Sequence, residues 1–402
     1  STEQSESIRA TFGGFYSNLE IREVNDFTYP GSEQLGNDSY GPNYSAEGAS
    51  VSDTGLWPEG VIFRNDVLRT DKQYGVFGEL NVDISEQFTA TLGARWYDIE
   101  ADLKGSAAGS WGNAGQTTDD MDAGNNLDEM FSGDNDTSAT DGFIGKISLS
   151  WTPSDDQLYY VTWSEGFRSG FLNRPYGETN GDYEVPPSYD TDNVTNYEFG
   201  WKLDLLDGNL RLNGDIFFVQ VENLQVGIFD ADITNLFFAD NAADAEIKGI
   251  EGDFIWLPSN YNGLTVSGGF SILDSKITEN FITSSTFVKE GDALAFAPEL
   301  QLNLQARYEW ELSSGKMAHV MPHLSYSDEA ATDIVIANRT MLDSWTLVGV
   351  TAGVTNDQWS AELYIDNLTD ERAEVSGNAT YNRDRINVTR PRTVGFRMSY
   401  DL

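Results

Sequence analysis

Short polar connections and long loops alternate along this chain, between segments that have the character of β-strands. The short connections lie at 85–87, 153–157, 206–209, 258–263, 313–316 and 356–358. The long ones lie at about 23–66, 101–141, 171–193, 223–243, 277–297, 328–340 and 368–390. A soluble sandwich does not need all its long loops at one end of its strands, whereas an outer-membrane barrel has short periplasmic turns and long extracellular loops. The alternation therefore predicts a transmembrane β-barrel.

Fourteen segments between these connections alternate apolar and polar residues with the period of two that a half-buried strand requires. In 74–84 the even positions are apolar apart from one glycine, and the odd positions include Glu79, Asn81 and Asp83. The segments are 7–22, 74–84, 88–97, 143–152, 158–168, 195–205, 210–222, 246–257, 264–276, 299–312, 317–327, 341–355, 359–367 and 391–402.

Three features of these segments favour a barrel over a sandwich. Tryptophans stand near strand ends, at Trp96, Trp151, Trp163, Trp256 and Trp345. The polar faces carry charges that suit a wet lumen, at Glu79, Arg95, Lys146, Glu198, Lys202 and Glu251. A meander of fourteen strands would also leave two long edges exposed unless the sheet closes. We therefore predict an all-β fold, an antiparallel up-and-down transmembrane barrel.

The composition excludes some functions and leaves one metal hypothesis open. The net charge of −41 argues against nucleic-acid binding, which needs a basic surface. No run of 18 apolar residues is present, so no membrane-spanning helix is predicted. Eight acids and no Lys or Arg occur from Asp119 to Asp141. Either these are solvated loop tips, or Asp119, Asp120 and Asp122 bind a divalent cation such as Ca²⁺. No other cofactor is required.

Candidate ligand-binding residues lie where a strand opens into a long loop. Arg168, Asn173, Arg174 and Tyr176 cluster there, and two arginines in so acidic a chain could hold an anionic ligand such as a ferric chelate or a uronic acid. The alternative is that the arginines pair with neighbouring carboxylates, such as Glu165 and Glu178.

Aromatic residues in two other loops are further candidates. Trp111 and Phe131 stand in 101–141, and Phe229, Phe237 and Phe238 stand in 223–243. Their rings could stack on a sugar or on an aromatic siderophore. They could equally pack the loops against one another.

The sequence gives little support to an enzyme. The only histidines, His319 and His323, share one face of a predicted strand but lie roughly 13 Å apart along it, too far to bind one metal ion. No nucleophile motif accompanies either residue and no Gly-rich phosphate loop is present. We expect both histidines at lumen or girdle positions, and we expect no catalytic residue.

The two ends of the chain also carry information. The last segment alternates through Phe396 and Tyr400 to an apolar Leu402, a pattern typical of the terminal strand that outer-membrane assembly machinery recognises. An ordinary amphipathic strand would show the same alternation. The first residues have no charged and apolar leader, so a signal peptide is expected to have been removed or to lie outside this chain.

Several motifs together resemble TonB-dependent outer-membrane receptors. They are TDKQYGVFGELNVDI at 70–84, YYVTWSEGFRSGFLN at 159–173, VTNYEFGWK at 194–202, IKGIEGDF at 247–254, LYIDNLTDER at 363–372 and the closing segment 390–402. Each motif alone is weak, but their order and spacing are specific. Members of that family have a 22-stranded barrel with a plugged lumen. The resemblance therefore implies that residues 1–402 are the last fourteen strands, with the plug domain and about eight strands outside this chain.

The resemblance also implies a function and partners. It implies a receptor in the bacterial outer membrane, with long loops extracellular and the short turns and the C-terminus periplasmic. Such a receptor takes up a scarce nutrient, of the ferric siderophore, cobalamin or oligosaccharide class, with energy delivered by TonB and its inner-membrane motor. Its other partners are the plug and remaining strands, outer-membrane lipid and lipopolysaccharide. The alternative is a passive diffusion channel closed from these fourteen strands alone.

Overall fold

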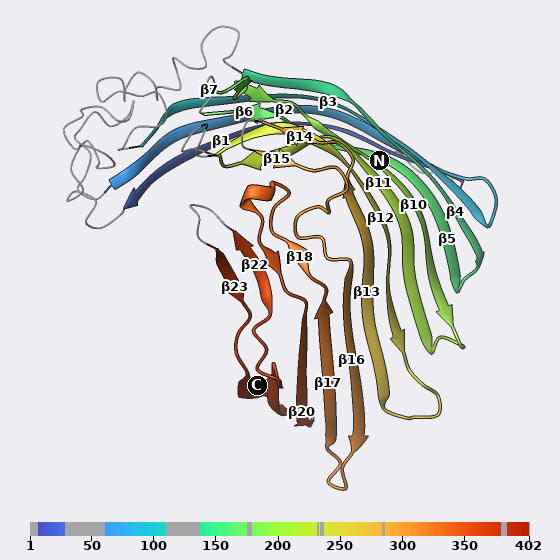
Figure 1. The fold of residues 1–402 in the computed structure, drawn as a ribbon. Helices are drawn as coiled ribbons and strands as arrows, with labels where there is room; N and C mark the ends of the chain where they lie inside the picture. Colours follow the sequence, from blue (N-terminus) through green and yellow to red (C-terminus); the bar gives the residue numbers. More distant parts are fainter. Residues whose placement is uncertain are drawn as a thin grey trace.

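One antiparallel sheet of fourteen strands makes up most of the computed structural model, which describes residues 7–28, 61–109, 137–174, 179–230, 233, 237–283, 286–378 and 384–401 (Figure 1). The strands are β1 (Ile8–Thr28), β2 (Val61–Asp83), β3 (Phe88–Gly109), β4 (Thr137–Ser154), β5 (Gln157–Arg168), β10 (Asp192–Leu205), β11 (Leu210–Ile228), β12 (Phe238–Trp256), β13 (Leu264–Ile277), β16 (Leu300–Glu311), β17 (Met317–Ser327), β20 (Trp345–Thr355), β21 (Trp359–Asp366) and β24 (Thr393–Tyr400). Each pairs with the next in this order. The predicted all-β, up-and-down class is confirmed.

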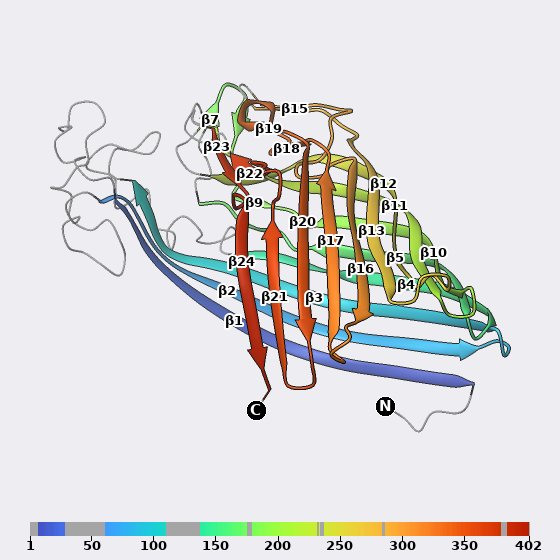
Figure 2. The same ribbon diagram turned by 90° about the horizontal axis from the view of Figure 1, so that it is seen from below.

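The sheet is open at its two edge strands, β1 and β24. No pairing joins these strands in the described residues, and Figure 2 shows them as the two borders of a strongly curved wall. The arrangement expected for a barrel closed from fourteen strands alone is therefore not the one observed. The fourteen predicted segments correspond in order to the fourteen strands.

Several strands extend beyond their predicted bounds at the end that carries the long loops, here called the loop end. The predicted loop 101–141 begins with residues that still belong to β3, because Leu103 keeps a ladder partner, Arg69, on β2. Residues 223–228 likewise continue β11. The predicted strand 341–355 is instead interrupted, because Met341 and Leu342 pair with a separate short strand and β20 begins at Trp345.

The wall has an apolar outer face and a polar inner face. Val76 and Phe199 point outward, with 60% and 44% of their surface exposed. On the inner face, Lys146 Nζ lies 3.4 Å from Glu79 Oε2, as the predicted polar faces require. Large inner-face rings also lie across glycines of the next strand, where a Cβ would collide with them. These pairs are Phe15 with Gly75, Tyr160 with Gly200, Phe217 with Gly249 and Tyr364 with Gly395.

The connections at the loop end fold into a compact region of their own, here called the loop layer. It contains the short strands β6 (Phe171–Leu172), β7 (Thr179–Asn180), β8 (Tyr183–Glu184), β9 (Ser188–Tyr189), β14 (Phe281–Ile282), β15 (Phe287–Val288), β18 (Ala330–Ala331), β19 (Met341–Leu342), β22 (Glu374–Asn378) and β23 (Arg385–Val388), with the 3₁₀ turn η3 (Ile336–Asn338). Its apolar core comprises Val185, Val221, Val226, Ile228, Ile233, Phe238, Ala242, Ala243, Ala245, Ile277, Val288, Ile334 and Val335. In the described residues no helix is long and apolar enough to cross a membrane.

Candidate functional site

A pocket of about 260 Å³ lies between the inner face of β1, β2 and β3 and the loop layer. We call it the inner-wall pocket. It is lined by Glu23, Val67, Arg69, Leu103, Phe171, Leu172, Asn173, Arg174, Tyr189, Phe237, Phe238 and Ala239. Asn173, Arg174, Phe237 and Phe238 were sequence candidates, and the rest include residues from strands far away in the chain.

The wall side of the pocket presents a guanidinium group over an aromatic ring. Arg69 Cζ lies 4.2 Å from the ring centroid of Phe171, within the range of a cation–π interaction. The ladder places Arg69 of β2 opposite Leu103 of β3, and Glu23 of β1 opposite Val67 of β2. Each pair thus joins one charged and one apolar side chain. Val67, Leu103 and Leu172 form a small buried cluster beneath them.

The loop side brings a second guanidinium group, that of Arg174. Burial lowers the pKa of Arg174, the carboxylate of Glu23 raises it, and the nearby positive charge of Arg69 lowers it. Burial also raises the pKa of the Tyr189 phenol, which Arg69 and Arg168 oppose. An arginine stays protonated even so. The pocket is therefore a positively charged, partly apolar site within a chain of net charge −41.

Asn173, another sequence candidate, connects two loops. Its Nδ2 donates to Pro186 O at 3.0 Å and to Ala239 O at 2.7 Å, and its Oδ1 accepts from Ala239 N at 2.8 Å. Its backbone N donates to Pro187 O at 2.8 Å. With only 3% of its surface exposed and its amide bonded on both atoms, Asn173 holds the pocket in shape.

Arg168 lies next to the pocket and is bound to a carboxylate. Its Nε and Nη2 donate to Asp192 Oδ2 at 3.0 and 2.5 Å, and Nη2 also reaches Gln225 O at 3.2 Å. Arg168 is thus paired with a carboxylate, as the alternative predicted, but the partner is Asp192 and not Glu165. Glu165 instead accepts from Gly145 N at 2.8 Å, where the ladder between β4 and β5 has ended.

The predicted aromatic residues of 223–243 differ in exposure, and their role toward a ligand stays a prediction. Phe237 lines the pocket and is 53% exposed, and its ring centroid lies 5.0 Å from that of Phe229. Phe238 is only 3% exposed and belongs to the loop-layer core. The candidates outside the described residues are Trp111, Asp119, Asp120, Asp122, Phe131, Tyr176, Glu178 and Leu402.

Sequence reasoning missed eight of the twelve residues that line the pocket, among them Arg69, Phe171 and Tyr189. Arg69 was assigned to no site because it stands just before the segment 74–84. Phe171 was available as a signal, since it lies between Arg168 and Arg174 in the same loop opening. Nothing in the sequence places Arg69 beside them, because the contact depends on how the loop that follows β5 lies against β3 and β2.

The remaining sequence candidates lie on the wall. His319 is 2% exposed with Nε2 3.4 Å from Glu362 Oε1, and His323 Nε2 lies 4.0 Å from Asp366 Oδ1. Both are on the inner face. Phe396 and Tyr400 are exposed on edge strand β24. No group of three or more metal-ligating side chains occurs within the described ranges.

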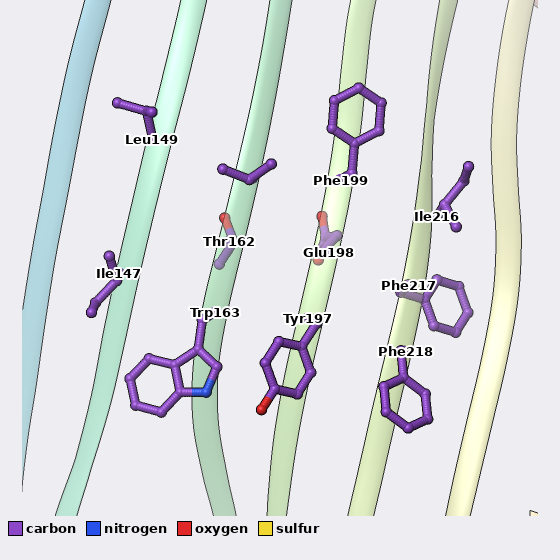
Figure 3. A pocket seen from close by; sticks show the side chains of 11 residues that line it. Ile147, Leu149, Thr162, Trp163, Tyr197, Glu198, Phe199, Ile216, Phe217 and Phe218 are labelled. Carbon is purple, nitrogen blue, oxygen red and sulfur yellow. The ribbon is translucent and has the colours of Figure 1, made fainter.

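A larger hollow, of about 540 Å³, lies on the outer face of the wall. Figure 3 shows that its side chains come from the neighbouring strands β4, β5, β10 and β11. The outward-facing ones are Ile147, Leu149, Val161, Trp163, Tyr197, Phe199, Ile216 and Phe218. Glu198 alternates with them and belongs to the inner face, where it accepts a hydrogen bond from Tyr160 at 2.5 Å. The hollow is part of the apolar outer surface and is not a polar ligand site.

The match to a family model decides the class of this protein. Residues 3–368 match the family described as TonB dependent receptor-like, beta-barrel, and the chain belongs to that family. Its members are outer-membrane receptors, so the resemblance read from the motifs is confirmed.

Individual relatives narrow the comparison. A protein named probable TonB-dependent siderophore receptor PiuA, from Acinetobacter baumannii, is 22% identical over 332 residues, which are 79% of this chain and 39% of that protein. The ferric yersiniabactin uptake receptor FyuA of Yersinia pestis has a similar structure, with a TM-score of 0.70 at 14% identity, over 100% of this chain and 52% of that one. The ferric-catecholate import receptor Fiu of E. coli K12 gives a TM-score of 0.64 at 14% identity, over 97% and 51%. The chain thus spans about half the length of these solved relatives.

Proposed function

We propose that this chain forms the C-terminal part of the barrel of an outer-membrane receptor that takes up a ferric siderophore with energy supplied through TonB. Family membership and the names of the relatives support the proposed activity, which is energy-coupled uptake of a ferric siderophore. The inner-wall pocket supports the kind of ligand. Two guanidinium groups beside aromatic rings suit an anionic iron chelate with flat donor groups, since arginine binds anions and stacks on rings.

In this proposal each part of the chain has a task. The loop layer faces the outside and the short turns face the periplasm, so the pocket is the first inner surface that an entering chelate meets. Arg69 and Arg174 attract and orient the anion, while Phe171, Tyr189 and Phe237 offer ring surfaces for its aromatic groups. The remaining barrel strands and plug domain complete the receptor, and TonB transmits the energy that opens it.

Charge removal in the pocket of the complete receptor tests the ligand site. The double variant Arg69→Gln with Arg174→Gln is compared with the unaltered receptor for binding of iron-55-loaded tricatecholate, which is anionic, and trihydroxamate, which is uncharged. A hydrogen bond to a charged group contributes about 1.5–3 kcal/mol, so we expect the tricatecholate to bind roughly 10-fold or more weakly in the variant.

The matched control is Arg307→Gln, which removes an inner-face arginine already paired with Glu309 at 2.8 Å. It should leave binding unchanged. Uptake by cells that carry the receptor must also stop when TonB is deleted. Receptor-dependent uptake that continues without TonB would contradict energy coupling and favour a passive channel.

A further inference from the structure

Arg95, on the inner face of β3, is a second positive centre that the pocket does not include. Its Cζ lies 4.9 Å from the ring centroid of Phe15 and 5.9 Å from that of Phe167. The Phe167 ring stacks in turn on Tyr97, with centroids 3.8 Å apart and planes at 17°. Arg95 and the pocket residue Leu103 share one face of β3, and at 3.3 Å per residue they lie about 26 Å apart along the strand.

The charge of Arg95 has no carboxylate partner among the residues that the structure describes. Its Nε is buried there without a hydrogen-bond partner. Three other arginines of the inner face are neutralised by carboxylates. Arg9 is paired with Asp83, Arg307 with Glu309 and Arg397 with Glu362. The chain has 65 acidic residues and only 24 basic ones, so carboxylates are abundant. Within the described part of the wall, Arg95 forms no ion pair with any of these carboxylates.

One short segment of chain connects Arg95 with the pocket. The ladder between β4 and β5 ends at Lys146 and Ser164, and the chain beyond it lies against the inner face of β3. Near the start of this segment the ring of Phe167 lies next to the Arg95 guanidinium, and four residues later the ring of Phe171 lies next to that of Arg69. Both ends of the segment therefore present the same chemistry, an arginine over a phenylalanine ring.

We propose that Arg95 with Phe15 and Phe167 forms a transit site. This site holds the anionic chelate briefly after the chelate leaves the inner-wall pocket and before it moves further along the inner face of the wall. The proposal rests on the proposed function. A guanidinium group that lies between two rings, with no carboxylate partner among the described residues, can bind the anionic and flat groups of the same ligand that the pocket holds. The competing explanation is that Arg95 only anchors Phe167 and so keeps the segment in place.

Separate measurements of binding and uptake distinguish these explanations. The variants Arg95→Gln and Arg95→Lys are made in the complete receptor, and iron-55-loaded tricatecholate is the probe for equilibrium binding to purified receptor and for initial uptake by cells. For Arg95→Gln we expect unchanged binding and an uptake rate reduced about 5- to 10-fold. For Arg95→Lys, which keeps the charge, we expect uptake close to that of the unaltered receptor.

Each other result overturns the transit site. Normal uptake by Arg95→Gln would show that the charge is not used. Equal loss of binding and uptake, shared by Arg95→Lys, would show an anchor for the pocket segment. The control Arg307→Gln should change neither quantity. If the unaltered receptor takes up no ferric chelate at all, the proposed function has failed, and that outcome is distinct from failure at Arg95.

Discussion

The wall and the loop layer of this protein are built in opposite ways. In the wall, large apolar side chains such as Val76 and Phe199 point away from the molecule, and polar side chains face inward. In the loop layer, Val185, Ile228 and Val288 are completely buried. The wall is thus held by its ladder of backbone hydrogen bonds and suits a hydrocarbon solvent. The loop layer is held by a packed core and suits water.

The comparison explains why the candidate site lies where the two regions meet. The inner face of the wall supplies fixed backbone positions, and Arg69 is held there by the register of β2 with β3. The loop layer supplies a packed surface that includes the lining residues Asn173 and Arg174. A site that joins the two combines apolar side chains with a few polar groups in fixed places, as ligand sites usually do.

The largest effect should come from truncating the loop-layer core. Replacing Ile228 by Ala creates a cavity at a fully buried position and should destabilise the loop layer by about 2–5 kcal/mol. Hydrogen exchange of loop-layer amides measures this loss. The wall control is Ile216→Ala, at an outer-face position that is 51% exposed, and it should change little. Equal destabilisation by both variants would remove the distinction between the two regions.

A charge on the outer face should have the next largest effect. Phe199→Arg places a cation where the wall meets lipid, and a charge near the bilayer midplane costs about 2–4 kcal/mol. Refolding into vesicles measures it. Thr162→Arg, at an inner-face position of the neighbouring strand β5, should be tolerated far better. If both variants refolded equally well, the outer face would not be the lipid-facing one.

The smallest effect should come from Asp333 in the loop layer. Burial raises the pKa of this carboxyl, although Val335 N donates to Oδ1 at 2.8 Å and Arg339 is near. Because the folded pKa exceeds the unfolded one, its contribution to stability is complete below the ordinary carboxyl pKa and is lost as the pH rises through the raised value. We expect Asp333→Asn, which keeps an acceptor for Val335, to flatten the acid side of the stability curve of the loop layer.

Protection factors from hydrogen exchange at pH 4.5 and 7.5, corrected for intrinsic rates, check this prediction. The unaltered protein should be relatively more protected at the lower pH than the variant. A matched control is Asp343→Asn, which changes an exposed carboxyl of the loop layer. Identical pH dependence in Asp333→Asn and the unaltered protein would show that the buried carboxyl does not control the stability of the loop layer.

The fold was largely predictable because its signals are local. A period of two over ten residues and a short polar turn can be read without knowing any distant contact, and both describe β2 and β3. The wall charges followed from the same period. The sequence did not show how far the strands continue beyond the predicted segments. That length depends on pairing between strands, as between Arg69 and Leu103.

The site was only half predictable because its contacts are not local. Arg168 was singled out, but its partner Asp192 begins the next strand of the sheet, on the far side of a long loop. The sequence does not show which residue of that strand pairs with Arg168. Arg174 and Phe237 were found as loop residues of suitable chemistry. Arg69 and Arg95 became relevant only through the rings of Phe171, in the loop after β5, and Phe167, at the end of β5, that lie next to them.

The early end of the ladder between β4 and β5 also bears on how such a receptor can change over evolutionary time. Residues 169–191 are not part of the fourteen-stranded ladder, and β5 and β10 stay in register on either side of them. Insertions, deletions and substitutions in this stretch therefore alter the shape and charge of the inner-wall pocket without shifting any strand. Under the proposed function, the preference for one chelate over another can diverge between lineages while the wall that carries the pocket stays the same.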